Sequence, residues 1–239
     1  MNIEIKIQLS ALNFLLVLNV VIFIIAFLLN SSVGFDNNLF YLMGGQITTR
    51  ITTGSWWLLT TANFFHIEIL HFAFNIISLY RIGQLVEYYY DGKKLFTTYV
   101  LGGIGGVWMS YLVSLLLNQN IFSLGASASI FALVGLLLGG TFRKNRFGRD
   151  LPFSTRDLLP FVFIAFVFGL MPGFNINNWA HLGGLITGVI LGLLIPNSLV
   201  RVDNRIEVLI TKVLFWISVV IFTLSYAALL FNAYNLLIK

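Results

Sequence analysis

Long apolar runs separated by short polar segments follow one another along the whole chain. A helix that crosses a bilayer needs about 20 mainly apolar residues. The pattern predicts seven such helices, of which the fifth is the shortest and begins near Pro160. They cover approximately residues 13–29, 63–85, 95–117, 122–141, 158–171, 178–195 and 208–231. The pattern therefore predicts an all-α polytopic membrane protein.

The composition agrees with a membrane location. Hydrophobic residues make up 58% of the 239 residues, charged residues make up 10%, and the mean hydropathy is +0.91. A soluble domain carries roughly 25% charged residues, so this chain has too little polar surface to cover a water-soluble globule. We expect a single transmembrane domain over residues 1–239. The first apolar run is long and no small-residue cleavage pattern follows it, which favours a true span over a cleaved signal peptide.

The basic residues are distributed unevenly between the two sides of the predicted helices. With the N-terminus in the cytoplasm, only Arg50 and Lys239 of the 14 lysines and arginines fall on the outer side. Cytoplasmic loops carry an excess of Lys and Arg, so we expect a multi-pass protein of the cell membrane with a cytoplasmic N-terminus. The net charge of +5 then reflects this topology and the lipid bilayer, and no nucleic-acid partner is expected.

All three histidines lie in predicted helices, His66 and His71 in the second and His181 in the sixth. Ionisable side chains inside a membrane are costly, so each is a candidate functional residue. A rise of 1.5 Å per residue places His71 roughly 10 Å below the outer end of its helix, His181 roughly 5 Å and Ser127 about 8 Å. The four residues are therefore expected near one level, toward the extracellular side.

This grouping suggests acyl-transfer chemistry. A serine hydroxyl needs a base, and an imidazole has a suitable pKa near neutrality; on this reasoning any of the three histidines could be that base. Glu68 is the only carboxylate near the outer end of a helix, so a Ser/His pair is more natural than a triad. The chain has no cysteine, which excludes thiol nucleophiles and cysteine-ligated metals, and no metal or organic cofactor is expected.

Small residues surround the candidate serine and histidine. Gly125 and Ala126 precede Ser127, and Gly184 follows His181 by three residues as the first of several glycines at every fourth position. Such stripes permit close helix packing in membrane proteins of any function. If the two helices meet there, His181 would lie beside Ser127, and Phe131, one turn after Ser127, could stack on the imidazole ring.

The second predicted helix presents His71 and Asn75 on one face, because they are four residues apart. An imidazole and an amide directed at one point are typical donors to a tetrahedral oxyanion. The same pair could instead form an ordinary polar contact between helices. On these residues alone, both interpretations remain open.

Together these residues resemble the rhomboid intramembrane serine proteases. Their order and helix assignment match the family, and the resemblance covers nearly the whole chain. It implies a rhomboid-like bundle with a six-helix core over about 13–195 and an additional C-terminal helix over about 208–231. The matching residues are His66, His71, Asn75, Gly125, Ala126, Ser127, Ala180, His181 and Gly184.

The resemblance implies an intramembrane serine endopeptidase that cleaves transmembrane segments of membrane proteins. Ser127 would be the nucleophile and His181 the general base. The oxyanion hole would consist of His71, Asn75 and the backbone amide of Ser127. Phe131 would stack on the catalytic imidazole, with supporting roles for Gly125, Gly184 and His66.

Two positions depart from the family pattern. The serine is usually followed by glycine, whereas Ala128 follows it here, and Trp56-Trp57 stands where a Trp-Arg pair is common. Ala128 favours an alternative, a weak or inactive rhomboid-like protein that serves as a membrane-protein chaperone or trafficking factor. A small-solute transporter is a third interpretation, but the sequence shows no paired half-helices interrupted at mid-membrane.

Overall fold

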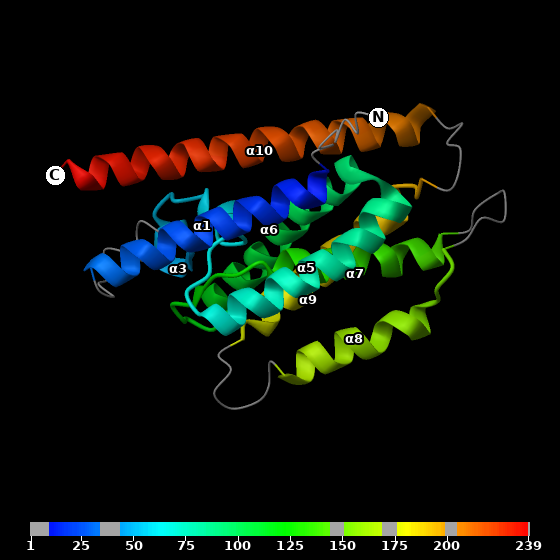
Figure 1. Cartoon of the computed structure of the whole chain (residues 1–239), viewed down its shortest axis with the longest axis horizontal. Coiled ribbons are helices and arrows are strands. Elements are labelled where there is room, and N and C mark those ends of the chain that lie inside the picture. The colour runs from blue at the N-terminus through cyan, green and yellow to red at the C-terminus, as the bar shows by residue number, and fades with distance from the viewer. Residues whose placement is uncertain (1–9, 34–43, 144–150, 169–175, 199–204, 239) are drawn as a thin grey trace, which may run out of the picture.

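The computed structural model describes residues 10–33, 44–143, 151–168, 176–198 and 205–238 as a helical bundle (Figure 1). Within these residues, each of the seven predicted spans overlaps one helix. The helices are α1 (Ala11–Val33), α5 (Ile69–Tyr90), α6 (Gly92–Leu116), α7 (Ser127–Phe142), α8 (Thr155–Phe168), α9 (Asn178–Leu194) and α10 (Arg205–Leu237). The all-α class predicted from the hydropathy pattern is confirmed.

The segment between α1 and α5 adds short elements that the hydropathy pattern did not predict. They are strand β1 (Gln46–Ile47) and two short helices, α3 (Thr48–Thr52) and α4 (Leu58–Thr61). Strand β1 pairs antiparallel with β2 (Phe122–Ser123), so that Gln46 lies opposite Ser123. This pairing fastens the segment before α5 to the segment that leads into α7.

The helices differ in length and in burial. Helices α1, α5, α6 and α10 are long and apolar enough to cross a membrane, whereas α7 and α9 are apolar but contain only 16 and 17 residues. A helix of 16 residues is about 24 Å long, shorter than the roughly 30 Å hydrocarbon core of a bilayer. Helix α7 is buried along nearly its whole length, so neighbouring helices rather than lipid surround it.

Two predicted helix starts were too early. The second helix begins at Ile69, because the backbone of residue 68 is extended. The residues Phe64 and His66 are buried before the helix begins. Helix α7 begins at Ser127, because Phe122–Ser123 forms a strand and Gly125 has φ +129°. That left-handed conformation is unfavourable for residues with a side chain and breaks a right-handed helix. The last three residues of the predicted fifth span, 169–171, lie outside the described residues.

Helices α7 and α9 pack backbone against backbone. A methyl group added at Gly184, Gly188 or Gly192 would collide with the carbonyl oxygens of Ala128, Ala132 and Leu136, respectively. The glycine stripe predicted in the sixth helix is therefore the surface that contacts α7. In lipid, where the hydrophobic effect does not drive helices together, close van der Waals packing of this kind is a main source of stability.

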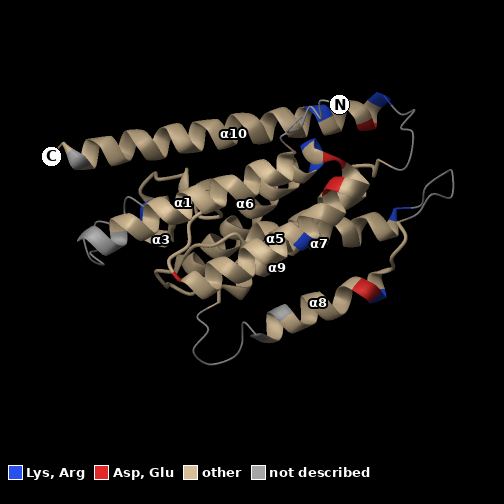
Figure 2. Cartoon of the chain, viewed as in Figure 1, with Lys and Arg blue, Asp and Glu red and all other residues tan. Residues whose placement is uncertain are grey.

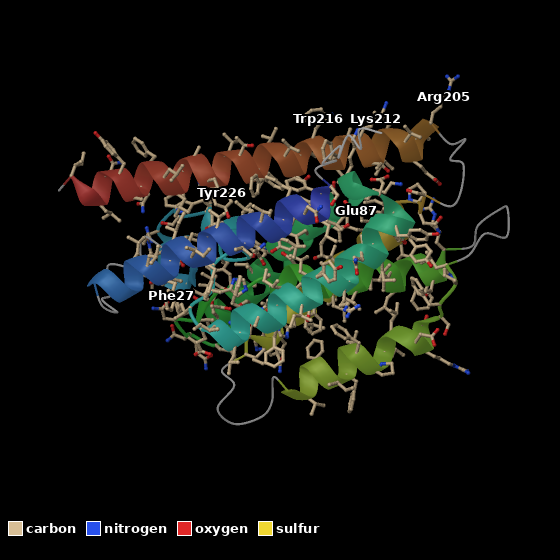
Figure 3. The ribbon with its side chains drawn as sticks, in the orientation of Figure 1. Phe27, Glu87, Arg205, Lys212, Trp216 and Tyr226 are labelled. Carbon is tan, nitrogen blue, oxygen red and sulfur yellow. The ribbon has the colours of Figure 1, made fainter. Side chains whose placement is uncertain are left out.

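Helix α10 lies along the outside of the bundle (Figure 1). Figure 3 shows Tyr226 on its inner side, and the Tyr226 ring packs on Phe64 with a centroid distance of 5.7 Å. Ser225 donates a buried hydrogen bond to the Thr60 hydroxyl at 3.0 Å. Trp216 is 62% exposed on the helix, as expected for a side that faces lipid. The additional C-terminal helix is thus packed against the segment that precedes α5.

Charged residues gather at one end of the bundle (Figure 2). At this end Arg143 pairs with Glu207 at 2.7 Å and joins the end of α7 to the start of α10. Lys94 pairs with Asp91 at 3.1 Å in the turn between α5 and α6. Helices α5, α7 and α9 all begin at the opposite end, which carries few charges (Figure 2).

The α7–α9 contact predicts the effect of adding volume to its glycines. Replacing Gly188 with valine should lower the free energy of unfolding by about 3 kcal/mol, because the new side chain meets the Ala132 backbone and cannot be accommodated by a rotamer change. Unfolding in mild detergent measures the loss. Ile186→Val is the matched control, since it places valine on the exposed face of the same helix. Equal stability of the two variants would contradict the packing described here.

Candidate active site

The candidate residues gather where three helices begin. His71 is the third residue of α5, Ser127 the first of α7 and His181 the fourth of α9. These helix starts lie at the end of the bundle that carries few charges (Figure 2). The sequence places the three residues far apart, and the parallel direction of the three helices places them at one end.

His181 lies beside the first turn of α7. Its imidazole stacks on the ring of Phe131, with a centroid distance of 4.2 Å and an angle of 17° between the planes. Phe131 is one turn after Ser127 and therefore on the same helix face. Gly184, three residues after His181, contacts the backbone of Ala128. Both contacts hold the imidazole next to the helix turn that Ser127 begins.

The Ser127 hydroxyl and the His181 ring, both within the described residues, are not joined by a hydrogen bond in this structure. Ser127 is half-buried, His181 is 5% exposed, and Nδ1 of His181 is buried without a hydrogen-bond partner. Hydrogen bonds between a nucleophile and its base often shorten only when substrate binds. The two residues lie on helix turns that are already in contact, through the Phe131–His181 stacking and the approach of Gly184 to Ala128.

His71 packs over the segment that leads to Ser127. A methyl group added at Gly125 would lie 2.6 Å from Cε1 and 2.9 Å from Nε2 of His71, and 3.8 Å from Nδ2 of Asn75. Gly125 is thus required both for its positive φ of +129° and for this close approach. The Asn75 amide donates to the carbonyl of His71 at 2.9 Å and retains a second hydrogen. Both side chains of α5 therefore lie at the start of α7.

His66 binds the same segment from a different direction. Its ring nitrogen Nε2 accepts a hydrogen bond from the backbone N–H of Ala126 at 3.1 Å. The side chain is 1% exposed and its ring lies edge-on to His71, 5.3 Å away. An acceptor nitrogen carries no proton, so this contact requires the neutral ring. His66 therefore holds the residue before Ser127 in place.

Helix α8 contributes a residue that the sequence did not single out. The ring of Phe166 lies edge-on to His181 at 6.1 Å and edge-on to Phe131 at 5.3 Å. Phe166 is one of several phenylalanines in an apolar helix, and no pattern in the sequence distinguishes it from those that face lipid. An aromatic pair from two helices thus encloses the imidazole.

The methyl group of Ala128 is accommodated by a neighbouring helix. A side chain at Gly106 of α6 would lie 2.7 Å from Cβ of Ala128, so the absence of one there leaves room for the methyl. The other departure, Trp56-Trp57, lies in a segment held by different contacts. Trp57 packs with a small cluster around Leu58, and Thr61 donates to the carbonyl of Gly44 at 2.7 Å.

The apolar helical bundle defines a polytopic membrane protein. It carries, at one end, a polar site with a buried imidazole near a half-buried serine. Among the described residues, no group of three or more His, Asp or Glu side chains is placed to hold a metal ion. Residues 53–198 match the model of the rhomboid domain. The chain belongs to the rhomboid family.

Several known proteins resemble this chain. RHOMBOID-like protein 4 of Arabidopsis thaliana is 30% identical over 154 residues, which cover 64% of this chain and 38% of that protein. Rhomboid protease GluP of Bacillus subtilis (strain 168) is 33% identical over 146 residues, 61% of this chain and 27% of that protein. The chain thus spans well under half the length of these two relatives. Rhomboid protease AarA of Providencia stuartii is 25% identical over 236 residues, 88% of this chain and 82% of that protein.

The contact of His66 with Ala126 can be tested through stability. We expect His66→Leu to lower the free energy of unfolding by about 1–3 kcal/mol, because it leaves the buried N–H of Ala126 without an acceptor. His66→Gln should lose clearly less, since its side-chain oxygen can replace Nε2 as the acceptor. Unfolding in detergent compares the two variants. Equal losses would show that the ring only fills space and that its nitrogen is not needed.

Proposed function

We propose that this chain is an intramembrane serine endopeptidase that cleaves transmembrane segments of membrane proteins, with Ser127 as nucleophile and His181 as general base. The stacking of His181 on Phe131, one turn from Ser127, is the observation that carries the proposal. Membership of the rhomboid family and similarity to the proteases GluP and AarA support it. The substrates would reach the site from the surrounding lipid bilayer.

The proposed reaction has two halves. Ser127 attacks the scissile carbonyl while His181 takes the hydroxyl proton, and His181 then returns this proton to the leaving amine. Water next attacks the acyl-enzyme, again with His181 as base, and releases the new carboxyl end together with free Ser127. The residues supply every proton transfer, so the cycle needs no cofactor.

The negative oxygen of each tetrahedral intermediate would be stabilised by His71, Asn75 and the N–H of Ser127. Ser127 is the first residue of α7, and the first N–H groups of a helix have no partner within the helix. The free hydrogen of the Asn75 amide and the His71 ring lie next to the same segment. Donors that are held in place before the reaction are the most effective type of oxyanion stabilisation.

The charge distribution supports a proposal for the location of the site within the cell. With the basic end of the bundle in the cytoplasm, the N-terminus is cytoplasmic and the site opens toward the extracellular side of the cell membrane. Residues 1–239 form one transmembrane domain in this proposal. Its six-helix core carries all proposed catalytic residues, and α10 is the additional C-terminal helix.

The alternative is a chaperone or trafficking factor that binds membrane helices without cutting them, and it rests on Ala128 in place of glycine. The contact between Ala128 and Gly106 weakens this alternative, because the added methyl packs against α6. A protein of this kind would still bind transmembrane segments. Cleavage therefore distinguishes the two functions, and binding does not.

The main test is cleavage of a labelled single-span substrate by the purified protein in liposomes. We expect the wild type to cut and both Ser127→Ala and His181→Ala to fall to background, because each removes one half of the dyad. Asn75→Ala provides a graded comparison, with a loss of about 10²–10³ in rate, as for one oxyanion donor. A wild type that binds the substrate without cutting it would establish the alternative.

A second test concerns Ala128. We expect Ala128→Gly to change the cleavage rate by less than about threefold, and to lower stability by roughly 0.5–1 kcal/mol through the poorer helix propensity of glycine. Parallel measurement of turnover and detergent unfolding checks both effects. A large gain in turnover would instead show that the methyl group restricts the space beside Ser127.

A further inference from the structure

Gln46 is a polar residue buried at the same end of the bundle as the proposed dyad. It is 0% exposed, and its side-chain amide donates to the hydroxyl of Ser110 on α6 at 2.9 Å. Burying an amide is costly unless it is hydrogen-bonded. A side chain of this kind in the interior of an apolar bundle therefore calls for a specific role.

The backbone of Gln46 is tied to the strand before the proposed nucleophile. Gln46 lies opposite Ser123 in the β1–β2 pair, and Ser123 precedes Ser127 by four residues. Beside this pair, the N–H of Thr48 donates to the carbonyl of Ile121 at 3.3 Å. The pairing of Gln46 with Ser123 is thus one of the contacts that determine where the chain enters the turn before α7.

The side chain of Gln46 is tied, through Ser110, to the helix that carries the proposed base. The hydroxyl of Ser110 also accepts from the amide of Asn177 at 2.6 Å. Asn177 is the N-cap of α9, and its side-chain oxygen accepts from the N–H of Ala180 at 3.2 Å. Its backbone carbonyl accepts from the N–H of His181 at 3.2 Å. Asn177 therefore fixes the first turn of α9, where His181 lies.

The structure assigns to Gln46, Ser110 and Asn177 the role of positioning residues that keep Ser127 and His181 in register. This assignment rests on the proposed function. The three side chains form one continuous hydrogen-bonded path from Gln46 to Asn177, the cap four residues before His181. The backbone pairing of β1 with β2 connects Gln46 to Ser123, four residues before Ser127. None of them contacts the reacting atoms in the proposed mechanism, so they act through the placement of the dyad.

A neighbouring pair shows how the path differs from ordinary packing. Thr48 donates to the hydroxyl of Ser114 at 2.9 Å, and both residues are buried. Ser114 is one turn after Ser110 on α6, and its own hydroxyl donates back to the carbonyl of Tyr111. This pair joins the same strand region to the same helix but makes no bond to α9. Ser114→Ala is therefore a matched control for Ser110→Ala.

The first measurement needs no catalysis. Hydrogen exchange of the full-length protein in detergent should speed up over residues 178–184 in Ser110→Ala, since the cap of α9 loses its anchor. Ser114→Ala should leave exchange there unchanged. Equal exchange over residues 178–184 in the two variants would overturn the assignment, whether or not the protein proves to be a protease.

The second measurement is the rate of substrate cleavage. We expect kcat to fall roughly 10- to 100-fold in Ser110→Ala and Gln46→Met, because a small misplacement of a catalytic group has effects of this size. KM should stay within about twofold, since the path does not touch substrate in the proposed mechanism, and Ser114→Ala should lose less than about threefold. Equal losses of kcat and stability in Ser110→Ala and Ser114→Ala would make the path merely structural.

The variant Asn177→Ser separates the hydrogen bond to Ser110 from the N-cap function of residue 177. Serine is as good an N-cap as asparagine, but it is too short to reach Ser110. We expect the kcat of Asn177→Ser to match that of Ser110→Ala. The double variant that combines these two substitutions should be no slower than either single variant, as for residues of one network. Additive losses would contradict a shared path. An inactive wild type would refute the proposed function alone, and the exchange comparison would still decide the link.

Discussion

The contact between the backbones of α7 and α9 is the constraint on which the rest of this structure depends. Gly184, Gly188 and Gly192 each meet a carbonyl of α7, and each step of four residues on one helix matches a step of four on the other. The two helices are therefore parallel and in register. A shift of one turn would carry His181 away from Phe131. The stacked imidazole is thus a consequence of the packing below it.

The segment before Ser127 is held more firmly than its length would suggest. The N–H of Gly125 donates to the carbonyl of Ala62 at 2.9 Å, and the N–H of Ala126 donates to His66. The β1–β2 pair holds the same segment two residues earlier. Glycine adopts positive and negative φ about equally readily, so contacts with the surroundings have to select the conformation of Gly125. Here three separate contacts do so, and they fix where α7 begins.

The sequence predicted the parts of this molecule that depend on composition and on simple periodicity. Apolar length located all seven helices, and the glycine spacing located the face of α9 that meets α7. Hydropathy could not locate the starts of α5 and α7, because Phe64 and Phe122 are as apolar outside a helix as inside one. Residues such as Phe166 and Gln46 could not be found either, since their roles depend on contacts between distant segments.

The additional helix α10 is physically connected to the site, although it carries none of the proposed catalytic residues. Its Phe222 and Tyr226 pack on the fully buried ring of Phe64, at centroid distances of 5.5 Å and 5.7 Å. Phe64 precedes His66 by two residues, and His66 holds the N–H of Ala126. Phe64, His66 and Ala126 lie outside the regular helices. Aromatic packing from α10 therefore limits how far the segments that carry them can move. Helix α10 therefore stabilises, by direct contact, the same segment that positions the start of α7.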